Sequence, residues 1–223
     1  MKPLPWSPSA LSDFVNCPRS YHEKRVLKRV KDEPNPYAAE GIRVHKAFED
    51  RQVDGAILPP DLDDHEEFML WLVTRPGQQW AELKAALNTQ MQPCEFFAPD
   101  VWTRLVIDFH KIHDDKGLLV DYKTGKQHSD FDQLILNALW MFAKYPQISE
   151  IMASYYWTQT RQHTYKIYAR AEIPQMWAKL IPDLKQYREA FKTDTWQPRQ
   201  SGLCAGYCPV KTCEFWRPKA RKR

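Results

Sequence analysis

The sequence lacks any long apolar run. No stretch of about 18 consecutive apolar residues occurs in the 223-residue chain, so the sequence predicts no membrane-spanning helix and no membrane partner. The N-terminal residues MKPLPWSPSALSDF also lack the apolar segment of a signal peptide. We therefore expect an intracellular, cytoplasmic protein.

The chain has five cysteines, an odd number that cannot pair fully within one chain. In a reducing compartment such cysteines are more often thiols or metal ligands than disulfides. Four of them lie near the chain ends: Cys17, and then Cys204, Cys208 and Cys213 in a C-x3-C-x4-C pattern. Four thiolates can hold Zn²⁺ or an iron–sulfur cluster, and the spacing does not separate the two, although the absence of a C-x2-C pair slightly disfavours a zinc ribbon. Cys94 lies outside this set.

Internal repeats and low-complexity linkers are also absent, and 223 residues suit one α/β core with a small appended lobe. The net charge of +4 is mildly basic, which permits a nucleic-acid partner without requiring one. Basic residues gather at the end of the sequence, where Arg221, Lys222 and Arg223 come last. They suit either phosphate contacts or a solvated tail.

Apolar periodicity and turn residues predict a mixed α/β arrangement. We expect helices over residues 7–16, 19–30 and 37–51, two more over 61–91 divided at Pro76-Gly77, one that ends near Tyr145, and a last one over 174–192, kinked or split at Pro182. Strands are expected at 95–98, 102–112 and 117–124, and a hairpin at 150–158 and 163–172. This order predicts a central mixed sheet flanked by helices.

The segment from Trp102 to Gly125 predicts a hairpin that gathers charge. A turn within Asp114–Gly117 places Asp108 opposite Lys123. Asp121 lies two residues before Lys123 and shares its face, so two carboxylates and an ammonium converge. Carboxylate oxygens are ligands for a divalent cation. The alternative is a salt-bridge cluster on an exposed hairpin, which would add little stability.

Further motifs accompany this hairpin. His45 lies on an expected helix within the sequence GIRVH, and Gln133, Asn137 and Trp140 form one stripe of the helix after the hairpin. Together with the four cysteines, in this order and spacing, these motifs resemble the PD-(D/E)XK nuclease superfamily. The resemblance is to its RecB-like branch with an iron–sulfur cluster, which includes CRISPR-associated exonucleases, the AddB nuclease domain and phage-encoded relatives.

This resemblance covers the chain from Ser9 to Trp216. It implies a restriction-endonuclease-like core in a single domain over residues 1–223. Residues 1–36 and 193–223 would form a cysteine-rich lobe that staples the two ends together.

The resemblance also implies roles for individual residues. His45 matches the metal-ligating histidine of the family's G-x3-H motif, and Asp108 matches its first acidic residue. Asp121 and Lys123 match the (D/E)-x-K pair, and the implied metal ligands are His45, Asp108, Asp121 and the backbone carbonyl of Tyr122. Asp108, Asp121 and Lys123 are therefore the implied catalytic residues.

Gln133 matches a glutamine thought to orient the DNA near the metal. The implied DNA-binding residues are Gln133, Asn137, Trp140, Arg221, Lys222 and Arg223. Glu95 is a loose match to a glutamate of relatives. Three departures stand out: Ile107 precedes Asp108 where proline is common, Asn137 replaces a tyrosine, and the middle cysteine of the usual C-x2-C-x5-C spacing is shifted by one.

The resemblance implies a metal-dependent DNA exonuclease acting on single-stranded or end-containing DNA in recombination, repair or phage DNA processing, in the host cytoplasm where a phage encodes it. Mg²⁺ or Mn²⁺ would bind the carboxylate site, where His45 favours Mn²⁺. A 4Fe–4S cluster, or alternatively Zn²⁺, would bind the four cysteines. A structure-specific or nicking endonuclease and a catalytically idle DNA-binding or assembly protein remain alternatives. No P-loop is present, so any helicase or recombination partner would be a separate protein.

Overall fold

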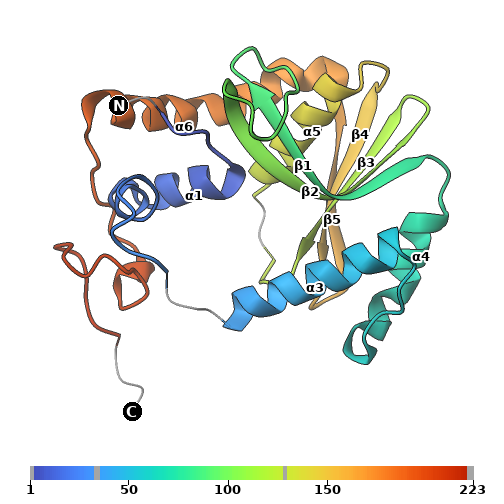
Figure 1. The fold of residues 1–223 in the computed structure, drawn as a ribbon, viewed down its shortest axis with the longest axis horizontal. Helices are drawn as coiled ribbons and strands as arrows, with labels where there is room; N and C mark the ends of the chain where they lie inside the picture. Colours follow the sequence, from blue (N-terminus) through green and yellow to red (C-terminus); the bar gives the residue numbers. More distant parts are fainter. Residues whose placement is uncertain (1–2, 33–35, 128–129, 220–223) are drawn as a thin grey trace. The chain divides into compact units, whose positions relative to one another are not determined.

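The structure is a computed structural model that describes residues 3–32, 36–127 and 130–219 (Figure 1). The chain divides into two compact units. One is Asn35–Trp177, and the other combines Met1–Pro34 with Ala178–Arg223. The second unit thus joins both end segments, and its later part begins at Ala178, inside the last helix, where the sequence suggested residue 193. No helix among the described residues is long and apolar enough to cross a membrane.

The unit Asn35–Trp177 is built on a five-stranded sheet in the order β1-β2-β3-β4-β5. The strands are β1 (Gln78–Asn88), β2 (Val101–His113), β3 (Lys116–Lys123), β4 (Glu150–Trp157) and β5 (Gln162–Ala169). β3 and β4 are parallel, whereas the other neighbours are antiparallel. A parallel pair needs a crossover, which contains α5 (Asp132–Lys144). The predicted mixed sheet flanked by helices is confirmed, and the arrangement agrees with a restriction-endonuclease-like core.

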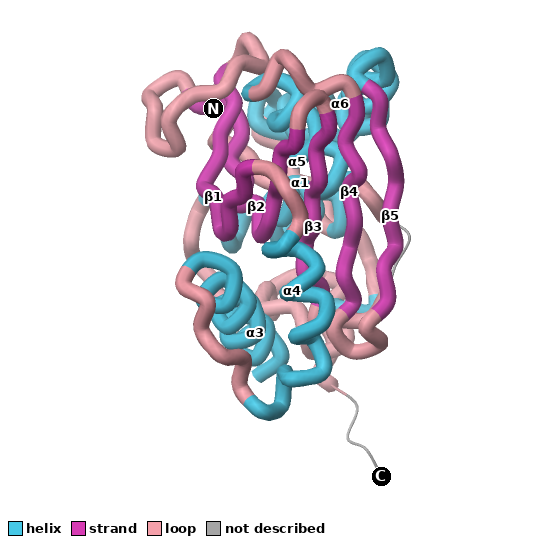
Figure 2. Tube along the Cα trace, turned by 90° about the vertical axis from the view of Figure 1, so that its right-hand side faces the viewer, coloured by secondary structure: helices cyan, strands magenta, loops and turns pink. Residues whose placement is uncertain are grey.

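Helices cover both faces of this sheet (Figure 2). α3 (Pro36–Val53), the 3-10 helix η2 (Pro60–His65) and α4 (Glu66–Thr74) pack on one face, where Phe48 lies against Tyr122 and Tyr156 joins the same core. α5 packs on the other face, where Phe131 at its start contacts Tyr155. Adjacent strand residues such as Tyr155 and Tyr156 point to opposite faces, so the two helical layers lie on opposite sides. A short 3-10 helix, η3 (Arg170–Glu172), follows β5.

β1 stands where the sequence predicted a second helix. Its residues QQWAELKAALN favour a helix by composition, but pairing along β2 and burial of Ala85–Leu87 outweigh that preference. Gly77 leads into the strand with a φ of 119°, which suits glycine, instead of dividing two helices. Residues 95–98, predicted as a strand, lie in the loop before β2, between Pro93 and Pro99, which cannot donate ladder hydrogen bonds.

The β2–β3 hairpin forms as predicted, but its register is shifted by two residues. His113 pairs with Lys116, so the turn is Asp114-Asp115, where Asp114 takes a φ of 51°. Gly117, which suggested a later turn, lies inside β3, where an added Cβ would crowd neighbouring side chains. A shift of one residue would reverse every side chain, whereas a shift of two preserves the faces.

The unit formed by both end segments holds α1 (Pro8–Asn16), α2 (Pro18–Tyr21), the π-helical turn η1 (His22–Val26), α6 (Ile173–Thr193) from Ala178 onward, and η4 (Gly202–Cys204). The helix expected over 19–30 is thus shorter and ends with η1. α6 continues through Pro182 as one helix. The core of this unit is aromatic and contains Phe14, Tyr21, Tyr187, Phe191 and Trp196.

Candidate active site

Three carboxylates stand in a row across β1, β2 and β3. Continued by one residue past Phe109 and Val120, the β2–β3 register places Asp108 opposite Asp121. The β1–β2 pairs on either side of Glu82 place it opposite Asp108. Asp108 was predicted opposite Lys123, which is two residues further along β3 and still shares the face. Asp108 is 6% exposed and Asp121 1% exposed, so their charges are poorly solvated. Neighbouring buried carboxylates repel one another, and such a row requires protons or cations.

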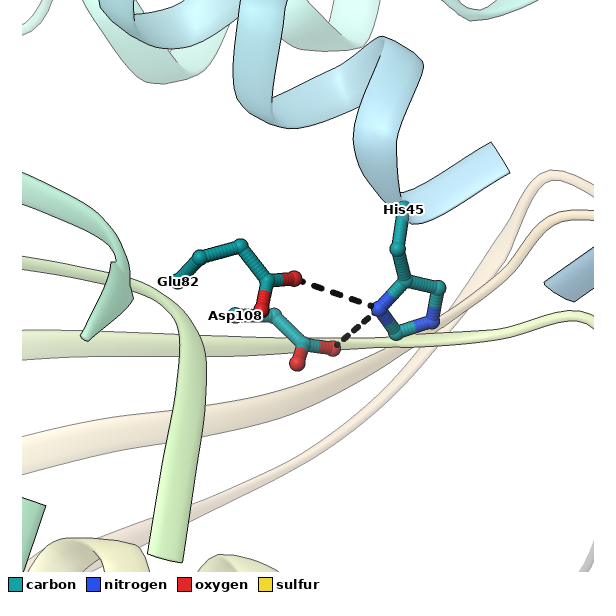
Figure 3. Close-up of side chains that lie close together, drawn as sticks. All are labelled: His45, Glu82 and Asp108. Carbon is teal, nitrogen blue, oxygen red and sulfur yellow. Dashed lines mark ion pairs between the residues drawn. The ribbon is translucent and has the colours of Figure 1, made fainter. Parts of the chain in front are cut away.

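His45 supplies one positive group from α3 (Figure 3). Its Nδ1 lies 3.5 Å from an oxygen of Glu82 and 3.5 Å from an oxygen of Asp108. Its Nε2 donates to the backbone oxygen of Tyr122 at 3.0 Å. The Tyr122 N–H in turn donates to Asp108 at 2.7 Å. The ligand atoms of His45, Glu82 and Asp108 all lie within 4.8 Å of one another.

The electrostatics of this group favour a cation. Burial works against a charged imidazole, but the hydrogen bonds to Asp108 and Glu82 outweigh it and raise the pKa of His45 to about 10. The imidazolium thus offsets part of the negative charge of the two carboxylates at neutral pH. A divalent cation can take over that role, because imidazole binds metal once its proton leaves.

Asp121 and Lys123 form a second group with Gln133 of α5. Lys123 Nζ lies 2.6 Å from Asp121 Oδ2 and donates to Gln133 Oε1 at 2.7 Å. Gln133 Nε2 donates to Asp121 Oδ1. Burial and the charge of Asp108 raise the pKa of Asp121 to about 7, although Lys123 opposes this shift. The ammonium also lies 4.9 Å from the ring centroid of Tyr155.

The group formed by His45, Glu82 and Asp108 fits a divalent cation. Two carboxylates and an imidazole nitrogen point toward one another, and carboxylate oxygens with imidazole suit Mg²⁺ or Mn²⁺. The second ring nitrogen of His45 is held by a backbone carbonyl, which is the usual arrangement for a metal-binding histidine. The Tyr122 carbonyl, expected as a metal ligand, accepts a hydrogen bond from His45 here, and its role as a ligand stays a prediction.

Several expected DNA-binding residues are not available at the surface. Asn137 is 1% exposed and Trp140 is 4% exposed, because both side chains lie on the inward face of α5. They share the inward face of the helix with Gln133, and that face is used for packing. Arg221, Lys222 and Arg223 lie outside the described residues.

Glu82 is the residue that the sequence did not indicate. It was hidden in a segment predicted as a helix, whereas the loosely matched Glu95 is exposed in the loop after β1. Glu82 has a φ of 47°, unusual for a glutamate, and this kink lies at the site. A strand assignment for 78–88 would have paired this segment with β2 and brought Glu82 to Asp108.

The four expected cysteines meet in the other unit. Cys17, Cys204, Cys208 and Cys213 line one pocket, together with Arg19, Ser20, Arg199, Val210 and Trp216. The backbone N–H of Arg199 points to Cys17 Sγ at 3.5 Å, and the backbone N–H of Ser201 points to Cys204 Sγ at 3.5 Å. Cys94 belongs to the unit Asn35–Trp177.

The sulfur atoms of this pocket are spread apart. Among the described residues, the group of three or more ligand atoms within 4.8 Å of one another is the one at His45, so no three of these sulfurs approach that closely. Tetrahedral Zn²⁺ with bonds of about 2.3 Å would bring its sulfurs to about 3.8 Å from one another. The four thiols therefore do not form a closed zinc tetrahedron in this structure.

Comparison with known proteins agrees with this fold. Residues 5–104 match the PD-(D/E)XK nuclease superfamily. An Eubacterium rectale crystal structure described as a "putative exonuclease" has a similar fold, with a TM-score of 0.53, 13% identity, and coverage of 98% of this chain and 90% of that chain. The structure of SSO0001 aligns with a TM-score of 0.41, 14% identity and coverage of 92% and 84%, too weakly to support an argument. No curated protein sequence matches significantly.

The match covers less than half of the chain, and the mixed five-stranded sheet is consistent with the fold of a PD-(D/E)XK nuclease domain. The sequence match ends before Asp108. The roles of Asp108, Asp121 and Lys123 therefore rest on their geometry.

Proposed function

We propose that this protein is a divalent-metal-dependent DNA exonuclease that acts on single-stranded or end-containing DNA. The observation that carries the proposal is the row of Glu82, Asp108 and Asp121, with His45 at one end and Lys123 at the other. The fold alone would not suffice, because a catalytically idle protein could retain it. An ordinary surface ion-pair cluster would not bury two of its carboxylates.

In this proposal His45, Glu82 and Asp108 would hold Mg²⁺ or Mn²⁺, which would supply Lewis acidity toward the scissile phosphate and lower the pKa of a bound water. Lys123 holds a positive charge beside the site, where it can stabilise negative charge that develops on the phosphate oxygens. Asp121 fixes that ammonium through the 2.6 Å ion pair. The Tyr122 backbone orients both His45 and Asp108.

The first test compares end-labelled linear and circular single-stranded DNA in the presence of Mn²⁺ or Mg²⁺. Wild type is expected to degrade the linear substrate only, and Asp121→Ala or Lys123→Ala is expected to abolish degradation. Cleavage of circles would instead establish an endonuclease. A folded wild type with intact metal centres that cleaves neither would refute the nuclease proposal and favour an idle DNA-binding or assembly protein.

We further propose that the cysteine pocket holds a 4Fe–4S cluster. Four thiols line one pocket, although Cys17 and Cys213 are almost 200 residues apart in the sequence. Four thiolates are the usual ligand set of such a cluster, and Zn²⁺ is the alternative occupant. The bound group would fasten the N-terminal helices to the C-terminal segment within one unit, and its binding energy would contribute to folding.

Metal analysis of protein purified without oxygen tests this second proposal. Iron and acid-labile sulfide with visible absorbance are expected in wild type and in Cys94→Ala, the matched control. Cys204→Ala and Cys213→Ala should lose the colour and melt at a lower temperature. Stoichiometric zinc in place of iron would overturn the cluster assignment, but the cysteines would still join the N-terminal helices to the C-terminal segment through a metal.

Recombination, repair and phage DNA processing all produce the DNA ends that such an enzyme would use. Any helicase or recombination protein working with it would be a separate chain, and a cytoplasmic setting would keep the cysteines reduced.

A further inference from the structure

Asp121, Lys123 and Gln133 form a closed ring of three side chains. Lys123 Nζ is 2.6 Å from one oxygen of Asp121 and 2.7 Å from the amide oxygen of Gln133. The amide nitrogen of Gln133 donates to the other oxygen of Asp121. Each member of the ring therefore contacts both of the others.

The chemistry of the ring calls for an amide at residue 133. An ammonium group can only donate hydrogen bonds and an ionised carboxylate can only accept them. A side chain that serves both at once must carry a donor and an acceptor, as Gln133 does. Glutamate would lack the donor toward Asp121, and asparagine would be one methylene shorter.

The elements around the ring hold Lys123 from three sides. Asp121 and Lys123 lie on β3, Gln133 lies in the first turn of α5, and the ring of Tyr155 on β4 lies 4.9 Å from Nζ. A lysine side chain carries four flexible methylenes, so it needs such contacts to keep its ammonium in one place. Gln133 is the contact that joins the helix to both charged groups.

We infer that Gln133 is a positioning residue that orients Lys123 and Asp121, in place of the DNA contact that its sequence motif suggests. The inference rests on the proposed nuclease function. Charge-assisted hydrogen bonds of this kind are directional, and losing them frees Lys123 without removing any charge from the site. Substrate binding stays the same while catalysis falls.

The test compares Gln133→Met, which keeps the length and loses both hydrogen bonds, with the matched control Gln127→Met. Gln127 is an exposed glutamine whose amide contacts Thr160 and Gln162. For Gln133→Met we expect kcat to fall about 10- to 100-fold, as for other residues that orient the ligands of an active site. KM for linear DNA, and DNA affinity measured with Ca²⁺, should stay near the wild-type values. The control should match wild type in all three.

A rise in KM or in the DNA dissociation constant at unchanged kcat would show a DNA contact and overturn the inference. Should Gln133→Met unfold, Gln133→Asn keeps the amide at a shorter reach and is expected to lower kcat less severely. Equal kcat in wild type and in a folded Gln133 variant would also overturn it.

A readout independent of activity separates this inference from the nuclease proposal. Under limiting acetylating reagent, followed by mass spectrometry, Lys123 should react faster in Gln133→Met than in wild type, with the exposed Lys84 as internal reference. If wild type cleaves no DNA but Lys123 reactivity rises, the nuclease proposal fails and the positioning role stands. If wild type cleaves DNA and Lys123 reactivity is unchanged, the positioning role fails alone.

Discussion

His110 is a buried neutral histidine, and it should make the stability of this protein depend on acidity. The residue lies on β2 with no exposed surface, and its ring stacks on Trp80 at 4.8 Å between centroids. Its Nε2 lies 3.2 Å from the Tyr145 hydroxyl. Burial lowers the pKa of His110 to about 4 from an ordinary value of 6.5. At a pH between about 4 and 6.5, the ring is therefore neutral in the folded protein and protonated in the unfolded chain.

The sign of the effect follows from proton counting. Between the folded and the unfolded pKa the unfolded chain binds more protons, so acid favours unfolding and stability rises with pH across this window. The stabilisation is complete above the unfolded pKa and is lost progressively as pH falls toward the folded pKa. For a shift from 6.5 to about 4, His110 costs about 2 kcal/mol of unfolding free energy between about pH 7.5 and about pH 5.

Urea unfolding of wild type and His110→Phe at these two pH values measures the effect. Asp121, whose raised pKa acts in the opposite direction over much of this range, is present in both proteins and cancels in the difference. The gap in stability between the two proteins should therefore change by about 2 kcal/mol in favour of the variant on going to the lower pH. Parallel pH dependences would refute the reasoning, whatever the absolute stability of His110→Phe.

Three further substitutions test the structure. Glu82→Gln should weaken Mn²⁺ binding about tenfold or more in calorimetry, because a ligand loses its charge, while Glu95→Gln in the exposed loop should bind as wild type. Gly77→Ala should lower the free energy of unfolding in urea by about 2 kcal/mol or more, because the φ of Gly77 is 119° and an added Cβ would overlap a backbone carbonyl of β2. Gly125 has open space around its Cα, so Gly125→Ala is the neutral control. Lys111→Met should cost about 1–3 kcal/mol, because the buried ammonium donates to carbonyls at the C-terminal end of α4 at 2.6 Å; an unchanged midpoint would contradict this.

The sequence correctly predicted which residues of β2 and β3 share a face of the sheet, because this depends only on whether their spacing is odd or even. The predicted pairing of β2 with β3 was shifted by two residues, because Gly117 resembles a turn residue but serves packing inside β3. The error is even, so Asp108, Asp121 and Lys123 still fall on one face. The cysteine pocket was predictable for a different reason: four cysteines at the two ends of the chain have little reason to occur there unless they meet.

Features that depend on tertiary contacts were not predictable. The segment 78–88 has the composition of a helix, and only its pairing with β2 makes it a strand. Because this segment was predicted as a helix, Glu82 was not recognised as a candidate site residue. The burial of Asn137 could not be read from its stripe either, because an active-site face and a core face have the same helical period.

The candidate site gathers like charges, and the protein offsets them from two ends. Glu82, Asp108 and Asp121 would repel one another across three strands, and burial strengthens that repulsion. His45 balances one end and Lys123 the other. His45 can exchange its proton for a metal ion, because neutral imidazole is a common metal ligand. The row is therefore divided into a half that can accept a cation and a half that keeps a fixed positive charge, and phosphodiester hydrolysis can use both.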